Sequence, residues 1–450
     1  MGNFLFDEFN NISPTAWKQK IQVELLGEDY NDSLVWKSNE GISVKPFYTL
    51  ENRHNKKIRL PGQGFKICQS IYVDDESIAN KLALDSLNRG ATAIQFIAKE
   101  IFDYTLLLNK IDLKNTFIYF NFAFLNAKFN IQLENYCQGN SIFFQVDIIG
   151  NLAKTGNWFI NIHKDILETT KFIKTINNPV CVDASLYQNA GATIIQQLSY
   201  ALAQTNEYIE IFGESVASKI HYSFSVGGNY FFEIAKLRAF RILLTNLYSV
   251  RGIQNSTVHI FTKPSYRNKT IYDYNVNMLR TTSECMSAIL GGSNTIANIS
   301  YDSIYHKSNE FGERIARNQL LILQKETRLS QAQEFANGSY YIENIEKQFA
   351  KKALDLFKQI EKSGGFLKQL KNGVIQKKIN ENAQKEQKEF DQNQKILLGI
   401  NKLPNINDRM KKELQIYPFL KTKNLKTLIL PVLQKRLSEE YEKKRLKKES

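Results

Sequence analysis

The chain has 450 residues, of which 43% are hydrophobic and 12% aromatic, so it can form a large core and is not disordered over most of its length. Lys and Arg total 59 against 45 Asp and Glu, which gives a formal net charge of +14. No apolar run approaches the roughly 20 residues of a membrane-spanning helix, so no membrane association is expected. The first residues also lack the basic and apolar regions of a signal peptide.

The excess positive charge lies near the end of the sequence. Residues 346–450 contain 26 Lys and Arg against 13 Asp and Glu, whereas the first 345 residues are nearly neutral. The signs alternate in "EYEKKRLKKES", which is typical of a solvated helix, so we favour that interpretation over a nucleic-acid-binding arm. The cysteines form no CxxC pair, which fits a reduced cytoplasmic protein without a metal site; they are Cys68, Cys137, Cys181 and Cys285.

Residues 1–60 show little periodic order and are interpreted as an arm, with one amphipathic helix over 12–26 capped by Ser13. Strands and helices then alternate from residue 61 to residue 345. The expected strands are 91–99, 115–124, 141–149, 179–186, 219–227, 256–263 and 294–301, with an eighth in "NGSYYIE" from Asn337. The expected helices are 74–90, 190–212, 229–248, 274–290 and 309–330.

This alternation predicts an α/β fold of the (β/α)8 TIM-barrel type, since eight units over roughly 250–270 residues match its size. A doubly wound open sheet is the alternative, although no GxGxxG follows the first strand. Residues 346–450 are expected to form a basic helical extension of the barrel.

Several predicted strands carry small polar residues on one face. In "KIHYSFSVG", His221, Ser223 and Ser225 share a face, and in "VCVDAS" Cys181 and Asp183 do so. Ordinary barrels fill their interior with Val, Ile and Leu. The pattern therefore indicates either a hydrogen-bonded polar core or a hydrophilic channel.

Four stretches together resemble the methylmalonyl-CoA mutase family, over about residues 60–345. They are "NAGAT" after the strand at 180, "VGGNYFFEIAKLRAFRILL", "YNVNMLRTTSECMSAILGGSNTIANISYD" and "FGERIARNQLLILQKETRLSQAQEFANGSYYIE". The resemblance implies a barrel through whose axis acyl-CoA threads, along small hydrophilic side chains. It also implies adenosylcobalamin on a flavodoxin-like domain that caps the barrel, and interconversion of methylmalonyl-CoA and succinyl-CoA.

The sequence departs from the family pattern wherever the resemblance places chemistry. Leu186 stands at the general-acid His of the family's G-Y-H-M-Q-E-A-G-A segment and cannot donate a proton. In "FKICQS", Ser70 stands at the Tyr that drives radical formation and Cys68 at the neighbouring Arg. Thr155 stands at the Arg that binds the substrate carboxylate, and Tyr272 at the Gln of T-E-Q-D-P-Y-N-N. No catalytic residue is therefore expected on this chain.

Five retained residues are candidates for contact with a ligand or partner. Arg314, Arg317 and Asn318 share one helix face at i, i+3 and i+4, where a ligand phosphate or a partner could bind. Arg238 and Arg280 are the other two. For all five we favour ordinary pairing within the fold or a solvated position, because such surface Arg pairs are common.

The D-x-H-x-x-G motif that ligates cobalt in the family is missing, and none of the five histidines has its context: His54, His163, His221, His259 and His306. We interpret the chain as a small (beta), non-catalytic subunit without the cobalamin domain. Adenosylcobalamin is then expected on a catalytic large subunit, around which the arm of residues 1–60 would wrap. The alternatives are a barrel that binds acyl-CoA and works with a separate cobalamin protein, and a binding module with a basic tail.

Overall fold

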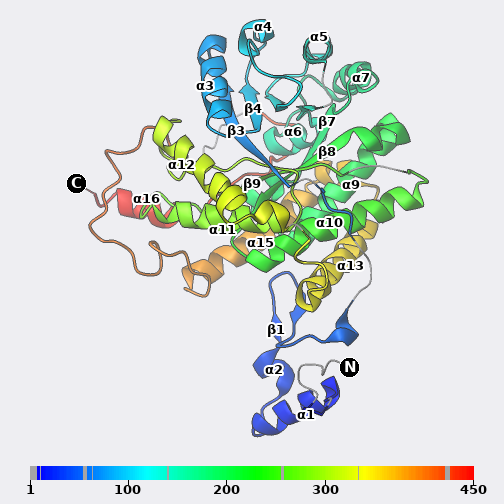
Figure 1. Ribbon diagram of the computed structural model, residues 1–450, viewed down its shortest axis with the longest axis vertical. Helices are drawn as coiled ribbons and strands as arrows, with labels where there is room; N and C mark the ends of the chain where they lie inside the picture. The colour runs from blue at the N-terminus through cyan, green and yellow to red at the C-terminus, as the bar shows by residue number, and fades with distance from the viewer. Residues whose placement is uncertain are drawn as a thin grey trace.

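The computed structural model describes residues 8–10, 12–53, 58–62, 64–138, 141–254, 258–332, 334–420 and 426–449. Its centre is an eight-stranded parallel sheet surrounded by helices (Figure 1). The strands are β3 (Lys66–Val73), β4 (Ala93–Ala98), β5 (Phe117–Phe122), β6 (Ile142–Phe144), β7 (Val180–Asp183), β8 (Ile220–Val226), β9 (Ile260–Pro264) and β10 (Thr295–Ile296).

The sheet closes into a barrel. Its hydrogen-bonded order is β6-β5-β4-β3-β10-β9-β8-β7, and every pairing in it is parallel. The two ends meet where the Phe144 amide donates to the Asn178 carbonyl and the Cys181 amide to the Val146 carbonyl, both at 2.9 Å. The predicted TIM-type barrel is therefore confirmed.

The structure differs from the expected strands in several places. The missing strand is β3, where the inward-facing Ser70 and the outward-facing Gln69, which donates to the Glu313 side chain, interrupt the apolar signal of a buried strand. The segment from Asn337 is not a strand, because Ser339 caps helix α13 (Tyr340–Lys362) and its aromatic residues enter that helix. The expected strand 141–149 stops at Phe144, since the Asp147 side chain accepts from the Gly150 amide at 2.6 Å and starts a helix.

Helices cover the outside of the barrel and occupy most of the connections between strands. They are α3 (Glu76–Asn88), α4 (Tyr104–Leu107), α5 (Ala127–Cys137), α6 (Ile148–Thr155), α7 (Ile162–Ile173), α8 (Ser185–Asn189), α9 (Ile194–Phe212), α10 (Tyr230–Val250), α11 (Val276–Leu290) and α12 (Glu310–Leu321). Asn229 caps α10 as expected. The helix expected over 309–330 stops earlier, and a π-helical turn follows at Ile322–Glu326. No helix in the described ranges is long and apolar enough to cross a bilayer.

The N-terminal arm projects from the body of the molecule (Figure 1). It contains α1 (Pro14–Glu24), α2 (Tyr30–Leu34) and a hairpin of β1 (Trp36–Lys37) with β2 (Ser43–Val44). Ser13 caps α1 as predicted, and α1 has no buried residue. The hairpin holds the arm to the barrel, because the Trp36 ring stacks on Phe232 of α10 at 5.3 Å.

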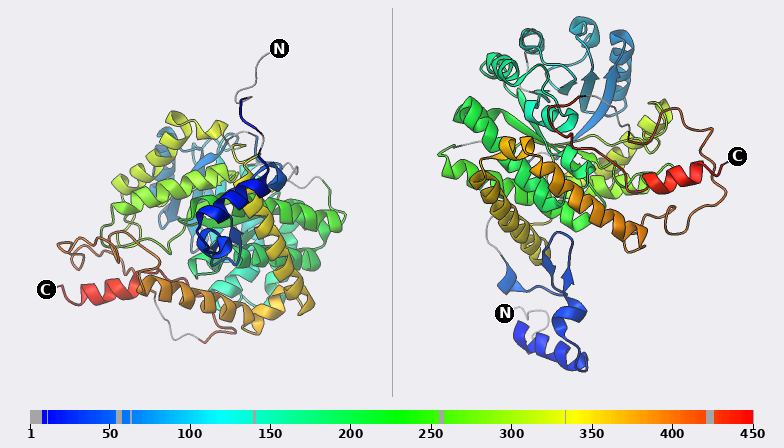
Figure 2. Two further views of the ribbon diagram at one scale, coloured as in Figure 1. Left: turned by 90° about the horizontal axis from the view of Figure 1, so that it is seen from below. Right: turned by 180° about the vertical axis from the view of Figure 1, so that it is seen from behind.

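The C-terminal part is less helical than expected. Helix α13 spans the expected domain boundary at residue 345 and packs against α9 and α10, so no break in the structure occurs there. It is followed by α14 (Phe366–Lys371) and α15 (Val374–Asp391), while α16 (Glu439–Leu446) lies near the end. Between α15 and α16 the described residues form no helix, and this part lies along one side of the barrel (Figure 2). Backbone contacts with the barrel hold it, which a sequence period cannot reveal.

Candidate functional site

Aromatic rings fill the barrel axis in its amino-terminal half. We call this group the aromatic plug. Its members come from β5, β6, β8, β9 and the residue directly before β9, and they are Tyr119, Phe143, His221, His259 and Phe261. Phe143 stacks on Tyr119 at 4.8 Å and on His259 at 4.2 Å. The Tyr119 hydroxyl lies 2.7 Å from Nε2 of His259, and burial lowers the pKa of His221 to about 3, so its ring is neutral.

A polar layer lies above the plug, towards the carboxyl ends of the strands. Nζ of Lys263 donates to Oγ of Ser70 at 3.0 Å and to Oε1 of Gln95 at 2.5 Å. Gln95 in turn donates to Gln145, which also accepts from Asn121 at 3.3 Å. The small polar faces seen in the sequence therefore belong to two layers, one of which is packed with rings and the other hydrogen-bonded.

A cavity of about 150 Å³ opens on this polar layer at the barrel mouth. Leu186 lines it from α8, where its buried side chain offers no donor or acceptor. Ser70 lies behind the cavity, bonded to Gln95 at 2.8 Å. Barrel enzymes carry their chemistry at this face, yet neither of these positions can transfer a proton to a substrate.

The remaining substituted positions lie away from the mouth cavity. Thr155, at the end of α6, is exposed and donates to the Asn151 carbonyl at 2.8 Å. The Tyr272 hydroxyl donates to Oε1 of Glu449 at 2.5 Å. Cys68 is buried in the axis, where burial raises the pKa of its thiol to about 12. None of these side chains lines the cavity.

The five candidate contact residues do not gather in one place. Arg314 and Asn318 face solvent on α12, whereas Arg317 is buried and donates to Oε1 of Gln69 at 3.1 Å. Arg238 is buried in an ion pair with Glu346 of α13 at 2.6 Å.

Arg280 holds the C-terminal part against the barrel. It donates to Oδ1 of Asn277 at 2.8 Å and to the Leu398 carbonyl at 2.7 Å. Arg238, Arg280 and Arg317 therefore have bonding partners within the fold.

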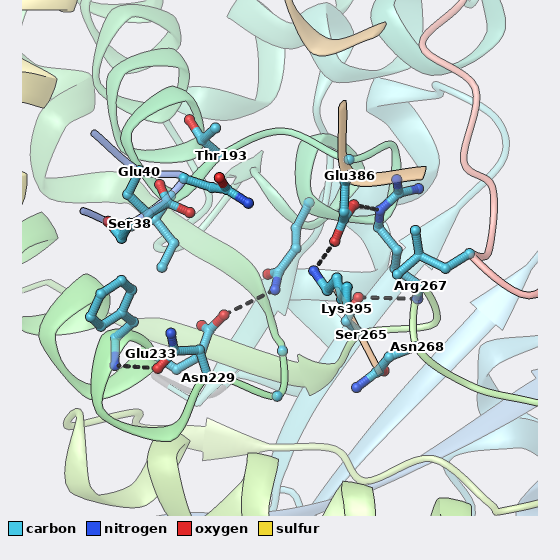
Figure 3. Close-up of a pocket in the computed structure, with 18 of the residues that line it drawn as sticks. Ser38, Glu40, Thr193, Asn229, Glu233, Ser265, Arg267, Asn268, Glu386 and Lys395 are labelled. Atoms are coloured by element: carbon cyan, nitrogen blue, oxygen red, sulfur yellow. Dashed lines mark hydrogen bonds and ion pairs between the residues drawn. The ribbon is translucent and has the colours of Figure 1, made fainter. Parts of the chain in front are cut away.

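A larger cleft, of about 890 Å³, lies between the N-terminal hairpin, the loops after β7, β8 and β9, and α15 (Figure 3). Its cations are already engaged: Glu386 pairs with both Arg267, at 2.5 Å, and Lys395. On the opposite wall lie Glu233, which is paired with Lys236, and Glu40, whose pKa burial raises to about 7. This arrangement disfavours binding of a phosphate group in the cleft.

The segment of residues 426–438 crosses the connections that follow β6, β7 and β9. Amides of Leu428 and Val432 donate to Gly156 and Ala153 at the end of α6, at 2.9 and 2.7 Å. Further along, the Leu437 amide donates to the Arg267 carbonyl at 2.9 Å. We call residues 426–438 the mouth strap, because they lie over the carboxyl-terminal face of the barrel.

Comparison with known proteins decides the family. Residues 111–448 match the methylmalonyl-CoA mutase family, which is more than half of the chain. The chain belongs to the methylmalonyl-CoA mutase family. Its small-subunit relatives include that of Porphyromonas gingivalis, 32% identical over 90% of this chain and 72% of the relative. The small subunit of Streptomyces virginiae is 30% identical over 51% of this chain and 38% of its own length. The large subunit of P. gingivalis is 29% identical over 54% of this chain and 35% of its own length.

The residues of this methylmalonyl-CoA mutase family member do not fit cobalamin at the barrel mouth. The mouth strap lies over the face that the cofactor would cap. Among the described histidines, His221 and His259 belong to the plug, His306 contacts Asp302 at 3.2 Å, and His163 is exposed on α7. His54 lies outside the described residues. No cluster of His, Cys, Asp and Glu in the described ranges could hold a metal ion.

Sequence reasoning missed the plug and Lys263. In "STVHIFTK", His259, Phe261 and Lys263 alternate on one strand face, and this pattern was a usable signal. It shows two rings followed by a cation, all turned to the barrel axis. The mouth strap had no comparable local signal, because the backbone bonds that hold it to the barrel join it to distant parts of the chain.

Proposed function

We propose that this chain is the small, non-catalytic subunit of a heterodimeric, adenosylcobalamin-dependent methylmalonyl-CoA mutase. The observation that carries the proposal is the aromatic plug. An acyl-CoA that threaded the axis would have to displace Phe143 and Tyr119, which are at most 4% exposed and packed at 4.8 Å. Close-packed rings of this kind do not part without loss of core packing.

The substituted positions support the same proposal. Leu186 provides no acid at the mouth, Ser70 is bonded into the polar layer, and Thr155 bonds to its own helix. The proposal therefore assigns both the cofactor and the chemistry to a large subunit. The four cysteines, all buried and unbridged, support a cytoplasmic location for the complex.

The N-terminal arm is proposed to contact that large subunit. It leaves the body of the chain, and α1 buries none of its own side chains. Trp17 and Leu26 are 49% and 93% exposed. Apolar side chains on a projecting element favour burial against another chain.

A mutase assay with adenosylcobalamin tests the proposal on three samples: this chain, the large subunit encoded in the same genome, and the two co-expressed. We expect turnover only where the large subunit is present, and co-purification of the two chains in equal amounts. Acyl-CoA binding by this chain alone is measured in parallel and is expected to be absent. Turnover or acyl-CoA binding by this chain alone would instead favour a barrel that works with a separate cobalamin protein.

A further inference from the structure

In the described part of the chain, Lys236 and Lys269 are buried and Lys263 is half-buried beside the barrel axis, and Lys263 differs from the other two in its partners. Lys236 forms an ion pair with Glu233, and Lys269 forms one with Glu284 at 2.7 Å. Lys263 has no carboxylate within ion-pair distance among the described residues, only the neutral oxygens of Ser70 and Gln95. Buried charges in proteins are normally paired, because an unpaired one loses its hydration without compensation.

The two carboxylates that line the same cavity are committed to other donors. Asp147 accepts from the Tyr208 hydroxyl at 2.5 Å, from Nε2 of Gln204 at 2.6 Å and from the Asp183 amide at 2.8 Å. Asp183 accepts from the Ser185 hydroxyl at 2.5 Å. Neither carboxylate forms an ion pair with Lys263, although Asp183 and Glu313 act on Lys263 electrostatically from a greater distance.

Lys263 faces the mouth cavity rather than a packed core. The cavity has a volume of about 150 Å³, with Lys154 as a second cation in its lining. The rest of its wall is mixed. It has the carboxylates of Asp147 and Asp183, amides and hydroxyls on one part, and four apolar side chains on another: Phe122, Phe159, Leu186 and Phe261. A cavity of this volume holds a molecule of about six non-hydrogen atoms.

We propose that the mouth cavity binds a short-chain carboxylate of about two to four carbons, with its carboxylate on Nζ of Lys263 and its hydrocarbon tail against the apolar wall. The anion supplies the direct ion-pair partner that Lys263 lacks, and the apolar wall selects a tailed acid over an inorganic anion. Burial lowers the pKa of Lys263, and a bound anion offsets that effect. The site makes this chain a ligand-binding subunit, whether or not it pairs with a large subunit.

The test titrates the purified full chain with acetate, propionate, butyrate, hexanoate and inorganic phosphate, followed by ligand-observed NMR. For a ligand of about six atoms we expect a Kd of roughly 1 mM for butyrate. Hexanoate exceeds the cavity volume and is expected to bind at least about tenfold more weakly, as is phosphate. Lys263→Met should weaken butyrate at least about tenfold, because it removes a charge-assisted hydrogen bond. The control Lys358→Met, at an exposed position of α13, should leave the Kd unchanged.

A second variant keeps the test decisive if Lys263→Met does not fold. Leu186→Phe narrows the cavity without touching Lys263, and should weaken butyrate more than acetate. The proposal is overturned if the wild-type chain shows no saturable binding of any of the short acids. Binding that tolerates Lys263→Met, or phosphate binding as tight as butyrate binding, would overturn it as well.

Discussion

The contact between the mouth strap and α6 depends on a single glycine. Gly156 ends α6 with φ +79°, and the amides of Leu428 and Ile429 donate to its carbonyl at 2.9 and 3.2 Å. A Cβ at this position would lie 2.6 Å from the Ile429 carbonyl oxygen and 2.7 Å from Cβ of Thr427. Gly156→Ala therefore forces the strap away from the barrel mouth.

The expected loss of stability has two parts. Placing alanine at positive φ costs about 1–2 kcal/mol by itself. Moving the strap gives up the two bonds to Gly156 and weakens the one from Val432 to Ala153. At about 1 kcal/mol for each bond, this adds about 2–3 kcal/mol.

Gly373→Ala is the matched control, because Gly373 has φ +75° in the same left-handed region as Gly156 but no atom within 4 Å of an added Cβ. Denaturant unfolding of both variants should show a loss of about 3–5 kcal/mol for Gly156→Ala and about 1–2 kcal/mol for the control. Hydrogen exchange should accelerate at Leu428, Ile429 and Val432 in the first variant only. Equal destabilisation with unchanged exchange in the strap would refute the claim that these residues cover the mouth.

Three further predictions test the axis, a buried carboxyl group and the arm. Phe143→Ala should lower the free energy of unfolding by about 3–5 kcal/mol, because it empties the centre of the plug. The control Phe231→Ala, at a partly exposed position, should lower the free energy of unfolding far less. A similar small decrease for both variants would indicate an open axis. Burial raises the pKa of Glu134 from 4.5 to about 7, so the native state holds an extra proton between these values and stability falls as pH rises through them. Glu134→Gln removes that fall and should be about 1–3 kcal/mol more stable than wild type at pH 8 but equal at pH 4, as thermal unfolding would show; a difference independent of pH would contradict the assignment. Deleting residues 1–27 should leave the melting temperature nearly unchanged, because α1 buries no side chain. The same deletion should abolish co-purification with the large subunit. Retained assembly would rule out the arm as the contact between the subunits.

Local sequence signals predicted the elements whose ends carry their own caps. Ser13 and Asn229 cap α1 and α10, and the strand-to-helix join after Asp183 was visible as an alternation that turns polar. The sequence also predicted that no acid stands at position 186, because this inference requires only that Leu186 be recognised at the family's histidine position. Such features depend on a few neighbouring residues, so the sequence by itself determined the barrel and its family.

Only the tertiary structure decided what fills the barrel and what covers it. Strand β3 was missed because the polar residues Gln69 and Ser70 lie at its centre. The rings of Tyr119 and Phe143 form a plug only when β5 and β6 turn them to a common axis. Lys263 stands out because no described carboxylate lies within ion-pair distance of its ammonium group, which is a property of the closed barrel. The mouth strap is held by backbone bonds to residues far away in the chain, and main-chain groups are the same in every residue type. Contacts of this kind produce no periodic pattern and no bias in composition, so only the folded structure reveals them.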